Sequence, residues 1–173
     1  MEQTTISADM DEGIDFAEVE RDHVRRHLYP AFRWVAHDAF SPLNPLRVPL
    51  AEARVGFVTT AGAHLADQAP FDIEAKAGDP SSRAIPSATP LADIRLTHAG
   101  YDTRRASADK NVVLPLDHLR ALVDTGRIGA LGPTVYSTMG YVADTAPLVR
   151  QTAPAVAGRL VDDGVDLVLL APT

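Results

Sequence analysis

The sequence predicts an α/β domain in which a parallel sheet is flanked by helices in a three-layer, doubly wound arrangement. Two short apolar runs, at 54–60 and 165–170, are typical of buried parallel strands. A helical pattern at 116–125 lies between them, and strand and helix patterns alternate along this part of the chain. Because such alternation is typical of a parallel sheet covered by helices, we expect this fold over residues 51–173.

The first fifty residues are expected to lie outside this sheet. Residues 1–13 are polar and without periodicity, which predicts a flexible tail. Residues 14–29 are predicted to form a helix, since acidic residues come early and basic residues late, as the helix dipole favours. The segment that completes 14–50 is rich in proline and aromatic residues, and we expect it to wrap around the domain.

The α/β domain is predicted to begin with two strands separated by a long loop. The first strand, at 54–60, runs into Ala61-Gly62, and a stretch of alternating residues predicts the second at 92–97. Residues 63–91 contain several prolines and little periodicity, so we expect a loop there. Loops of this length in compact domains are usually functional or disordered.

The second half of the domain supplies the strongest helix and the strongest strand. Leucines and a valine at i, i+3, i+6 and i+7 predict the helix at 116–125, and Gly126 is a candidate for its C-terminal cap. A weaker strand is predicted at 128–139. Prolines inside the helical pattern at 145–163 predict a kink or two short helices. The apolar run at 165–170 is the most strand-like of all.

Composition excludes several classes of function. The chain has 23 acidic and 16 basic residues and a formal charge of −7, so it would repel a nucleic-acid backbone. It has no cysteine, which excludes disulfides, thiolate metal sites and a cysteine nucleophile within these residues. No window approaches the roughly 20 apolar residues of a membrane span, and the N-terminus is unlike a signal peptide. We therefore expect a cytoplasmic protein that binds neither nucleic acid nor membrane.

A series of ordered sequence blocks points to a known family. They are 58–64 (VTTAGAH), 78–83 (GDPSSR), 98–102 (HAGYD), the stretch 106–129, and 163–166 (DGVD) followed by an apolar strand. In this order the blocks resemble the selenoprotein B family, the subunits of glycine, betaine, sarcosine and D-proline reductases. The resemblance extends from residue 46 to residue 173.

The resemblance is strongest to the D-proline reductase branch. It rests there on the Thr-Thr-Ala-Gly segment, on residues 68–72 (QAPFD) and on residues 139–141 (MGY). The family implies reductive cleavage of a C–N bond in a small amino acid or amine. Its members attack the substrate α-carbon with a selenolate or thiolate, while a pyruvoyl group on a partner subunit activates the amine. The resemblance thus implies an oligomeric oxidoreductase subunit that binds no cofactor of its own.

The family's redox residue, a selenocysteine or cysteine, directly follows the strand that matches 165–170. The present sequence stops at Thr173. We therefore expect no catalytic residue within the chain and the redox residue immediately after Thr173, because a UGA codon was read as a stop or because the chain was cut there. The chain alone should be inactive, and its sheet, incomplete at the C-terminal side, should be marginally stable or depend on a partner.

A non-catalytic role is the alternative. In it, the chain is a binding or scaffold protein that retains the amino-acid pocket or the subunit interface. The nucleotide sequence after the Thr173 codon discriminates the two hypotheses. UGA followed by an open frame with a cysteine three codons on favours the reductase, whereas another stop codon or unrelated sequence favours the scaffold.

Candidate binding residues follow the predicted strands, since ligands bind beyond the carboxyl ends of parallel strands. Histidine, tyrosine and aspartate can move protons or orient a substrate, and hydroxyls and an arginine can bind a carboxylate. The same side chains could instead cap strands or fix loops. We expect the loops after Thr60, Thr97 and Leu170 to converge, so that His64, His98 and Thr173 lie around one cleft. We expect no metal site, although His64, His98 and Asp109 offer the ligand types for one. The candidate residues are Thr59, Thr60, His64, Arg83, His98, Tyr101, Asp102, Ser137 and Thr138.

Overall fold

The computed structural model describes residues 44–173, together with His23 and His27. The chain divides into two units, Met1–Leu43 and Asn44–Thr173, and the account below concerns the second. The tail predicted at 1–13, the helix predicted at 14–29 and most of the predicted wrap lie outside the described residues.

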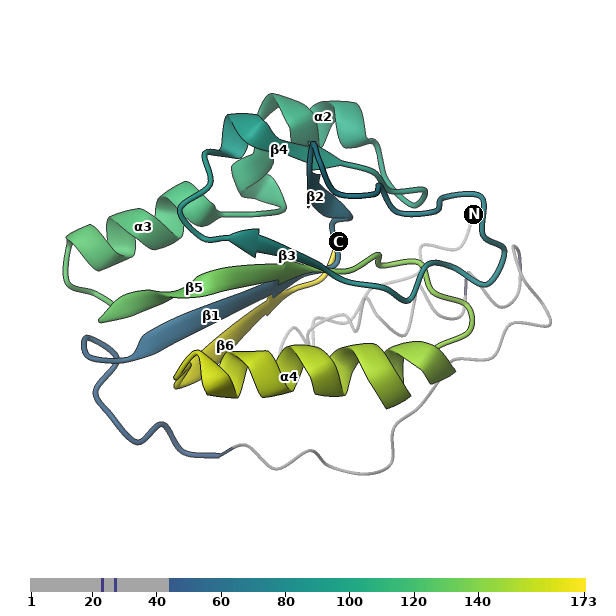
Figure 1. Ribbon diagram of the computed structural model, residues 1–173. Coiled ribbons are helices and arrows are strands. Elements are labelled where there is room, and N and C mark those ends of the chain that lie inside the picture. Colours follow the sequence, from purple (N-terminus) through teal and green to yellow (C-terminus); the bar gives the residue numbers. More distant parts are fainter. Residues whose placement is uncertain (1–22, 24–26, 28–43) are drawn as a thin grey trace, which may run out of the picture. The chain divides into compact units, whose positions relative to one another are not determined.

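A four-stranded sheet with the order β3-β5-β1-β6 forms the centre of the second unit (Figure 1). The central strand β1 (Arg54–Thr59) is parallel to both β5 (Ala130–Ser137) and β6 (Leu167–Ala171). At one edge β3 (Arg83–Pro86) runs antiparallel to β5. The predicted α/β fold is confirmed, but the sheet is mixed because β3 reverses direction.

A separate two-stranded ribbon forms from β2 (Ala63–Leu65) and β4 (Ile94–Leu96), which pair antiparallel. A 3-10 turn, η2 (Leu91–Asp93), precedes β4. The strand predicted at 92–97 therefore exists, but its place in the main parallel sheet was wrong. Gly62, at φ 68°, turns the chain out of β1 and into β2, so that the ribbon leaves the sheet.

The predicted loop at 63–91 was also wrong in part, since it contains β2 and β3. Both strands are short, three and four residues, and β3 ends at a proline. Strands of this length give too few alternations for a period to be visible in the sequence. Tertiary pairing with β4 and β5 creates them.

Helices cover both faces of the sheet (Figure 1). On one side lie α2 (Thr103–Ala108), the 3-10 turn η3 (Lys110–Val112) and α3 (Leu116–Asp124). On the other side the π-helical turn η4 (Leu148–Thr152) continues directly into α4 (Ala153–Asp162). The predicted interruption within 145–163 is this change from π to α geometry, and Gly126 ends α3 at φ 66°, as its capping role requires.

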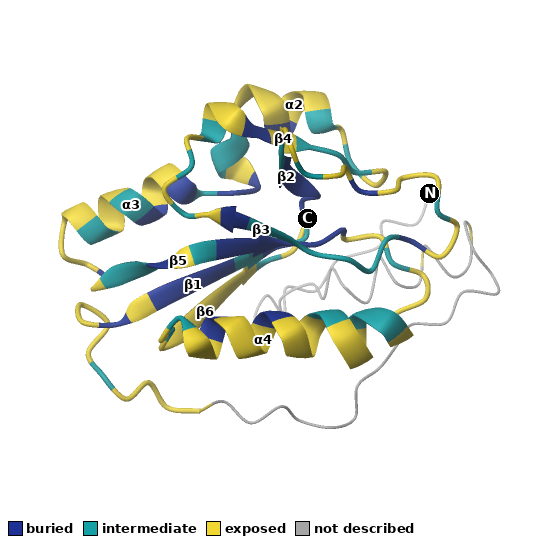
Figure 2. Cartoon of the chain, viewed as in Figure 1, coloured by how far each residue is buried: buried dark blue, intermediate teal, exposed yellow. Residues whose placement is uncertain are grey.

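The larger core lies between the sheet and the layer formed by α2, α3 and the ribbon (Figure 2). Phe57 of β1, Leu114 and Leu116 are fully buried there. On the opposite face only Tyr136, Val156 and Leu160 form a buried cluster among the described residues. Among the described strands, β6 pairs with β1 alone, and its side chains stay partly exposed, Leu170 by 67%.

Candidate functional site

The carboxyl ends of three parallel strands meet at one edge of the sheet. Register pairs Thr59 with both Ser137 and Ala171, so β1, β5 and β6 end side by side. The segments that follow are tied together by their backbones: Thr138 N–H donates to Thr59 O at 2.9 Å, and Thr60 N–H donates to Ala171 O at 3.2 Å. The loop segments therefore start from fixed positions at this edge.

Hydroxyl groups at this edge hold the strand ends in place. Thr59 Oγ1 donates to Val113 O at 2.9 Å, and Ser137 Oγ accepts from Ala63 N–H at 2.8 Å. Both side chains are fully buried. Both hydroxyls thus cap strand ends, which is the alternative to ligand binding that the sequence analysis left open.

Thr60 links the first and last strands. Its Oγ1 accepts a hydrogen bond from Thr173 N–H at 2.8 Å. This bond fixes the backbone direction of the residues that follow β6. The C-terminus accordingly lies beside the ends of the parallel strands and below β2 (Figure 1).

His98 reaches the same place from the loop after β4. Gly140 N–H lies 3.0 Å from its Nε2, and Gly100 N–H lies 2.8 Å from its Nδ1. A neutral imidazole accepts at one nitrogen, whereas an imidazolium accepts at neither. Burial lowers the pKa of His98 below its usual value of 6.5, and the two facing N–H groups act in the same direction. His98 is therefore held as a neutral acceptor and is poorly suited to donate a proton.

Tyr101 supports His98 from the side. The two rings lie 4.7 Å apart between centroids with a 44° tilt, and the Tyr101 hydroxyl donates to Ala61 O at 2.8 Å. Burial raises the pKa of Tyr101, so the phenol stays protonated and keeps this bond. Tyr101 thereby connects His98 to the loop after β1.

Asp102 has a different task. Its carboxylate caps α2 by accepting from Arg104 N–H at 3.1 Å, and it is exposed. The Arg104 side chain, followed by the backbone N–H groups of α2, lowers the pKa of Asp102. The residue is thus placed as the N-terminal cap of α2.

Gly140 is the residue at this site that the sequence analysis did not select. A Cβ there would lie 2.9 Å from Thr173 O and 3.1 Å from both His98 Nε2 and Thr60 Oγ1. Only a residue without a side chain allows these three neighbours to approach so closely. The signal was available, because a glycine that follows a strand in Ser137-Thr138-Met139-Gly140 can mark a close backbone approach.

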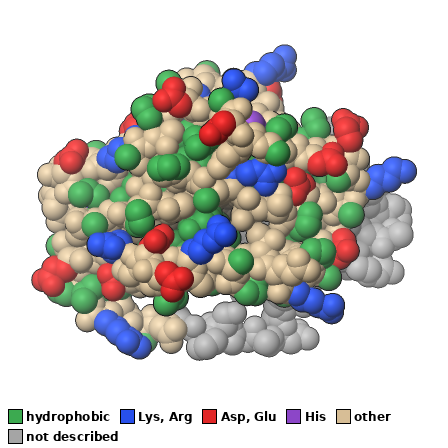
Figure 3. Space-filling view, viewed as in Figure 1, with side chains coloured by type: hydrophobic (Ala, Val, Ile, Leu, Met, Phe, Trp, Pro, Cys, Tyr) green, Lys and Arg blue, Asp and Glu red, His purple; other side chains and the backbone are tan. Residues whose placement is uncertain are grey.

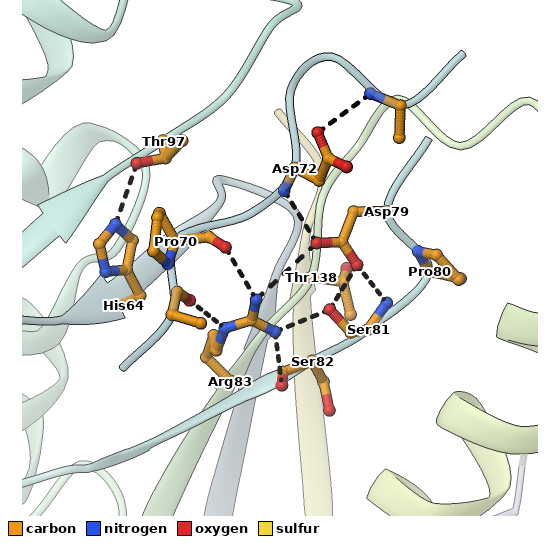
Figure 4. A network of polar contacts seen from close by, with 12 residues as sticks. His64, Pro70, Asp72, Asp79, Pro80, Ser81, Ser82, Arg83, Thr97 and Thr138 are labelled. Carbon is orange, nitrogen blue, oxygen red and sulfur yellow. Dashed lines mark hydrogen bonds and ion pairs between the residues drawn. The ribbon is translucent and has the colours of Figure 1, made fainter. Parts of the chain in front are cut away.

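His64 has a separate set of partners. Its Nδ1 lies 2.8 Å from Leu65 O, which can only accept, so Nδ1 carries the proton. Its Nε2 then accepts from the Thr97 hydroxyl at 2.9 Å (Figure 4). The imidazole is buried, and both nitrogens are used within the ribbon. The structure does not place His64 among the contacts of His98 and Thr60.

Arg83 organises the loop between β2 and β3 (Figure 4). Its guanidinium lies 4.2 Å above the Phe71 ring and 3.7 Å from the Asp79 carboxylate. The four hydrogen bonds of its guanidinium all go to acceptors of its own loop, and none goes to Thr60 or His98. These acceptors are the carbonyl oxygens of Ala69, Pro70 and Ser82 and the hydroxyl of Ser81.

Asp79 completes this loop network. Burial raises the pKa of its carboxyl, but hydrogen bonds from the Ser81 hydroxyl and from the backbone N–H groups of Asp72 and Ser81, together with Arg83, lower it further than burial raises it. The carboxylate therefore stays charged and holds the turn that precedes β3. Thr138, the last candidate, is buried and lines a cavity beneath α4, while its backbone joins the strand edge.

Comparison with known proteins identifies the family. The model of the glycine/sarcosine/betaine reductase selenoprotein B family matches residues 32–173. The chain belongs to this family. The resemblance noted in the sequence is thereby confirmed, and it covers the whole α/β unit that carries the strand-end contacts.

Relatives of the selenoprotein B family with curated names support the assignment. The D-proline reductase subunit gamma of Acetoanaerobium sticklandii is 36% identical over 127 residues, which cover 73% of this chain and 51% of that protein. The glycine reductase complex component B subunit gamma of Carboxydothermus hydrogenoformans is 31% identical over 135 residues, 76% of this chain and 31% of that protein. The chain thus spans about half or less of these selenoprotein B relatives.

Betaine reductase is represented among the relatives of this selenoprotein B family member as well. The betaine reductase complex component B subunit beta of Peptoclostridium acidaminophilum is 41% identical over 76 residues, 44% of this chain and 17% of that protein. No solved structure shows a significant match to the chain.

Two further features of the described residues bear on function. Among residues 44–173, with His23 and His27, no three histidine or acidic side chains are grouped so that they could hold a metal ion. Within that same part of the chain, no helix has the length and apolar character needed to cross a membrane.

Proposed function

We propose that the chain is a subunit of a complex that reductively cleaves a C–N bond of a small amino acid or amine, with D-proline as the first candidate substrate. The proposal rests on the contacts among Thr60, His98, Gly140 and Thr173 at the edge where three parallel strands end. Open α/β sheets bind ligands at this edge. The names of the relatives support the class of reaction and favour D-proline as the substrate to test first.

The contribution of this chain would be to position the redox residue. By family resemblance that residue follows Thr173, whose N–H is fixed by the Thr60 hydroxyl. The position after Thr173 would then lie beside Gly140 and the neutral imidazole of His98. A selenolate or thiolate needs a defined direction of attack, and this frame of hydrogen bonds provides one.

His98 and Tyr101 would act as positioning residues. Gly140 N–H lies 3.0 Å from His98 Nε2, and Tyr101 contacts both the His98 ring and Ala61 O. Together they connect the loops after β1, β4 and β5. We propose that they shape the substrate-facing wall and that the reacting atoms are supplied from outside residues 44–173.

The partner would carry the electrophile. The chain has no cysteine from which it could generate a pyruvoyl group, so we propose that a second subunit supplies it. When bound at the site, that group's carbonyl would activate the substrate nitrogen as a leaving group. The chain itself would bind the substrate and exclude water from the reacting carbon.

The products distinguish the candidate substrates. Cleavage of the Cα–N bond of D-proline adds two electrons and two protons, opens the ring and gives 5-aminopentanoate without releasing an amine. Glycine, sarcosine and betaine would instead release ammonia, methylamine and trimethylamine. Each product has a different mass, so one measurement identifies the substrate.

The test is to express the gene with the reading frame that follows it and with its partner subunit. The purified complex is incubated with each substrate and dithiothreitol, and the products are analysed by mass spectrometry. We expect 5-aminopentanoate from D-proline. Release of an amine from another substrate would correct the substrate, whereas an intact complex without any product would contradict the reductase role and favour the scaffold alternative.

A further inference from the structure

A polar cavity lies beside the β2–β4 ribbon. Its volume is about 570 Å³, within the range of small-molecule sites. The ribbon, the loop after β2, α2 and η3 all contribute to its walls. The polar side chains in its lining are His64, Gln68, Arg95, Thr97, Ser107 and Lys110.

The pairing of the ribbon places Arg95 beside His64. In an antiparallel pair, directly opposed residues lie on the same face, and successive residues alternate between faces. Ile94 and its partner Leu65 turn toward the main core, so His64 and its partner Arg95 turn to the opposite face. Strand β4 borders the cavity with residues of both faces, Ile94 and Leu96 as well as Arg95.

The charges around the cavity are of one sign. Arg95 and Lys110 line it, and no aspartate or glutamate does. Among the described residues, the ion pairs are made by other arginines, Arg83, Arg104 and Arg120, so neither cavity cation has an acidic partner there.

The neutral polar groups of the lining are mostly satisfied within the protein. His64 and Thr97 bond to each other, and the Gln68 amide accepts from Leu65 N–H and donates to Ala84 O. The donors that remain for a ligand are the Arg95 guanidinium, the Lys110 ammonium and the Ser107 hydroxyl. All three favour an anionic oxygen.

We propose that this cavity is a binding site for a phosphate-group dianion. The fork-shaped guanidinium of Arg95 and the point-charge ammonium of Lys110 together carry two positive charges, which match a dianion. A ligand with a single carboxylate carries one negative charge and would balance only one of them. A free amino acid is disfavoured, because its ammonium group would find no carboxylate in the lining. The site is thus distinct in chemistry from the amino-acid site of the proposed function, and it does not depend on reductase activity.

The test is calorimetric titration of the full chain with inorganic phosphate at constant ionic strength. We expect one saturable site, and binding weaker by about tenfold or more in each of Arg95→Gln and Lys110→Gln, as for loss of a charge-assisted hydrogen bond. The matched control Arg127→Gln removes the same charge from an exposed position outside the cavity and should bind as the wild type does. Circular dichroism of each variant verifies folding.

Two further ligands define the source of the phosphate group. Ribose 5-phosphate binding more tightly than inorganic phosphate would assign a phosphate ester, and the reverse order would assign free phosphate. Acetate should bind at least about tenfold more weakly than either, since it carries one charge. The proposal is overturned if phosphate does not saturate, if Arg127→Gln weakens binding as much as the cavity variants, or if acetate competes equally.

Discussion

The two faces of the central sheet differ in how much apolar surface they bury. The face toward α2, α3 and the β2–β4 ribbon carries a cluster of eleven buried residues, whereas the face toward α4 carries a cluster of three. In Figure 2 most of β1 is coloured as buried, whereas β6 is coloured mostly as exposed. The first face thus supplies most of the burial that stabilises the unit, while β6 is held chiefly by its pairing with β1.

Apolar side chains are correspondingly more exposed on β6 than on β1. Val168, Leu169 and Leu170 of β6 are 37%, 44% and 67% exposed, and an apolar cavity of about 350 Å³ separates part of β6 from α4. On the face seen in Figure 3, hydrophobic side chains are interspersed with charged ones of both signs. The candidate site lies where the well-packed strands β1 and β5 meet this less covered one.

The largest expected effect is the difference in stability loss between a truncated side chain in β1 and one in β6. Phe57→Ala removes a fully buried ring and should lower the free energy of unfolding by about 3–5 kcal/mol. Leu169→Ala removes a side chain that is 44% exposed and should cost about 1 kcal/mol. Urea unfolding followed by circular dichroism measures both. Equal losses would show that β6 is as well buried as β1 in solution.

A pair of glycines tests how tightly α4 packs. A Cβ at Gly56 of β1 would lie 2.9 Å from Leu160 Cδ2 and from Val165 Cγ1, so Gly56→Ala should destabilise by about 1–3 kcal/mol. A Cβ at Gly158 of α4 meets nothing within 4 Å, and Gly158→Ala should stabilise by about 0.5–1 kcal/mol. Thermal unfolding of both variants provides the measurement. A neutral Gly56→Ala would mean that α4 moves freely against the sheet.

A smaller effect is expected on how the stability of the protein depends on pH below 7. Burial lowers the pKa of His98 in the folded state, so the unfolded chain binds the proton more readily. Stability from this group is fully present above the ordinary value of 6.5 and is lost as pH falls from there toward the lowered folded pKa. His98→Gln should flatten the decrease in stability between pH 7 and pH 5. An unchanged slope would show that another group causes it.

The sequence predicted the strands and the helix that carry long periodic patterns. It missed the short strands that form only by pairing with another strand. The strands at 54–60 and 165–170 and the helix at 116–125 formed within one or two residues of their expected bounds, since each carries several apolar residues in register. Strands β2 and β3 were missed because three or four residues give no period, whereas β4 was predicted but assigned to the main sheet. The antiparallel β3 also could not be inferred, since strand direction depends on the connection and not on local composition.

The site was predictable to a similar extent. The rule that ligands bind beyond strand ends selected Thr60, His98 and Tyr101, which the structure brings together. The same rule also selected His64, because it follows the strand predicted at 54–60 and the strand β2, in which it lies, was not foreseen. Gly140 was missed because a glycine offers no functional group; its position after a strand could mark a close backbone approach, but only the structure shows which neighbours approach it.

The central claim is that the contacts around Gly140 position the reaction. Gly140→Ala places a methyl group 2.9 Å from Thr173 O and 3.1 Å from His98 Nε2, so it should displace Thr173 and, under the proposed function, the redox residue that Thr173 positions. Gly158→Ala is the matched control, since it makes the same change in an open helix position.

The most direct test measures kcat/KM for the identified substrate in the complete complex carrying each variant. The account predicts a decrease of about 100-fold for Gly140→Ala, the scale of a 1 Å misplacement, with unfolding temperature and complex assembly preserved, and no change for Gly158→Ala. Full activity of Gly140→Ala in an intact complex would contradict the placement of the site at the strand ends.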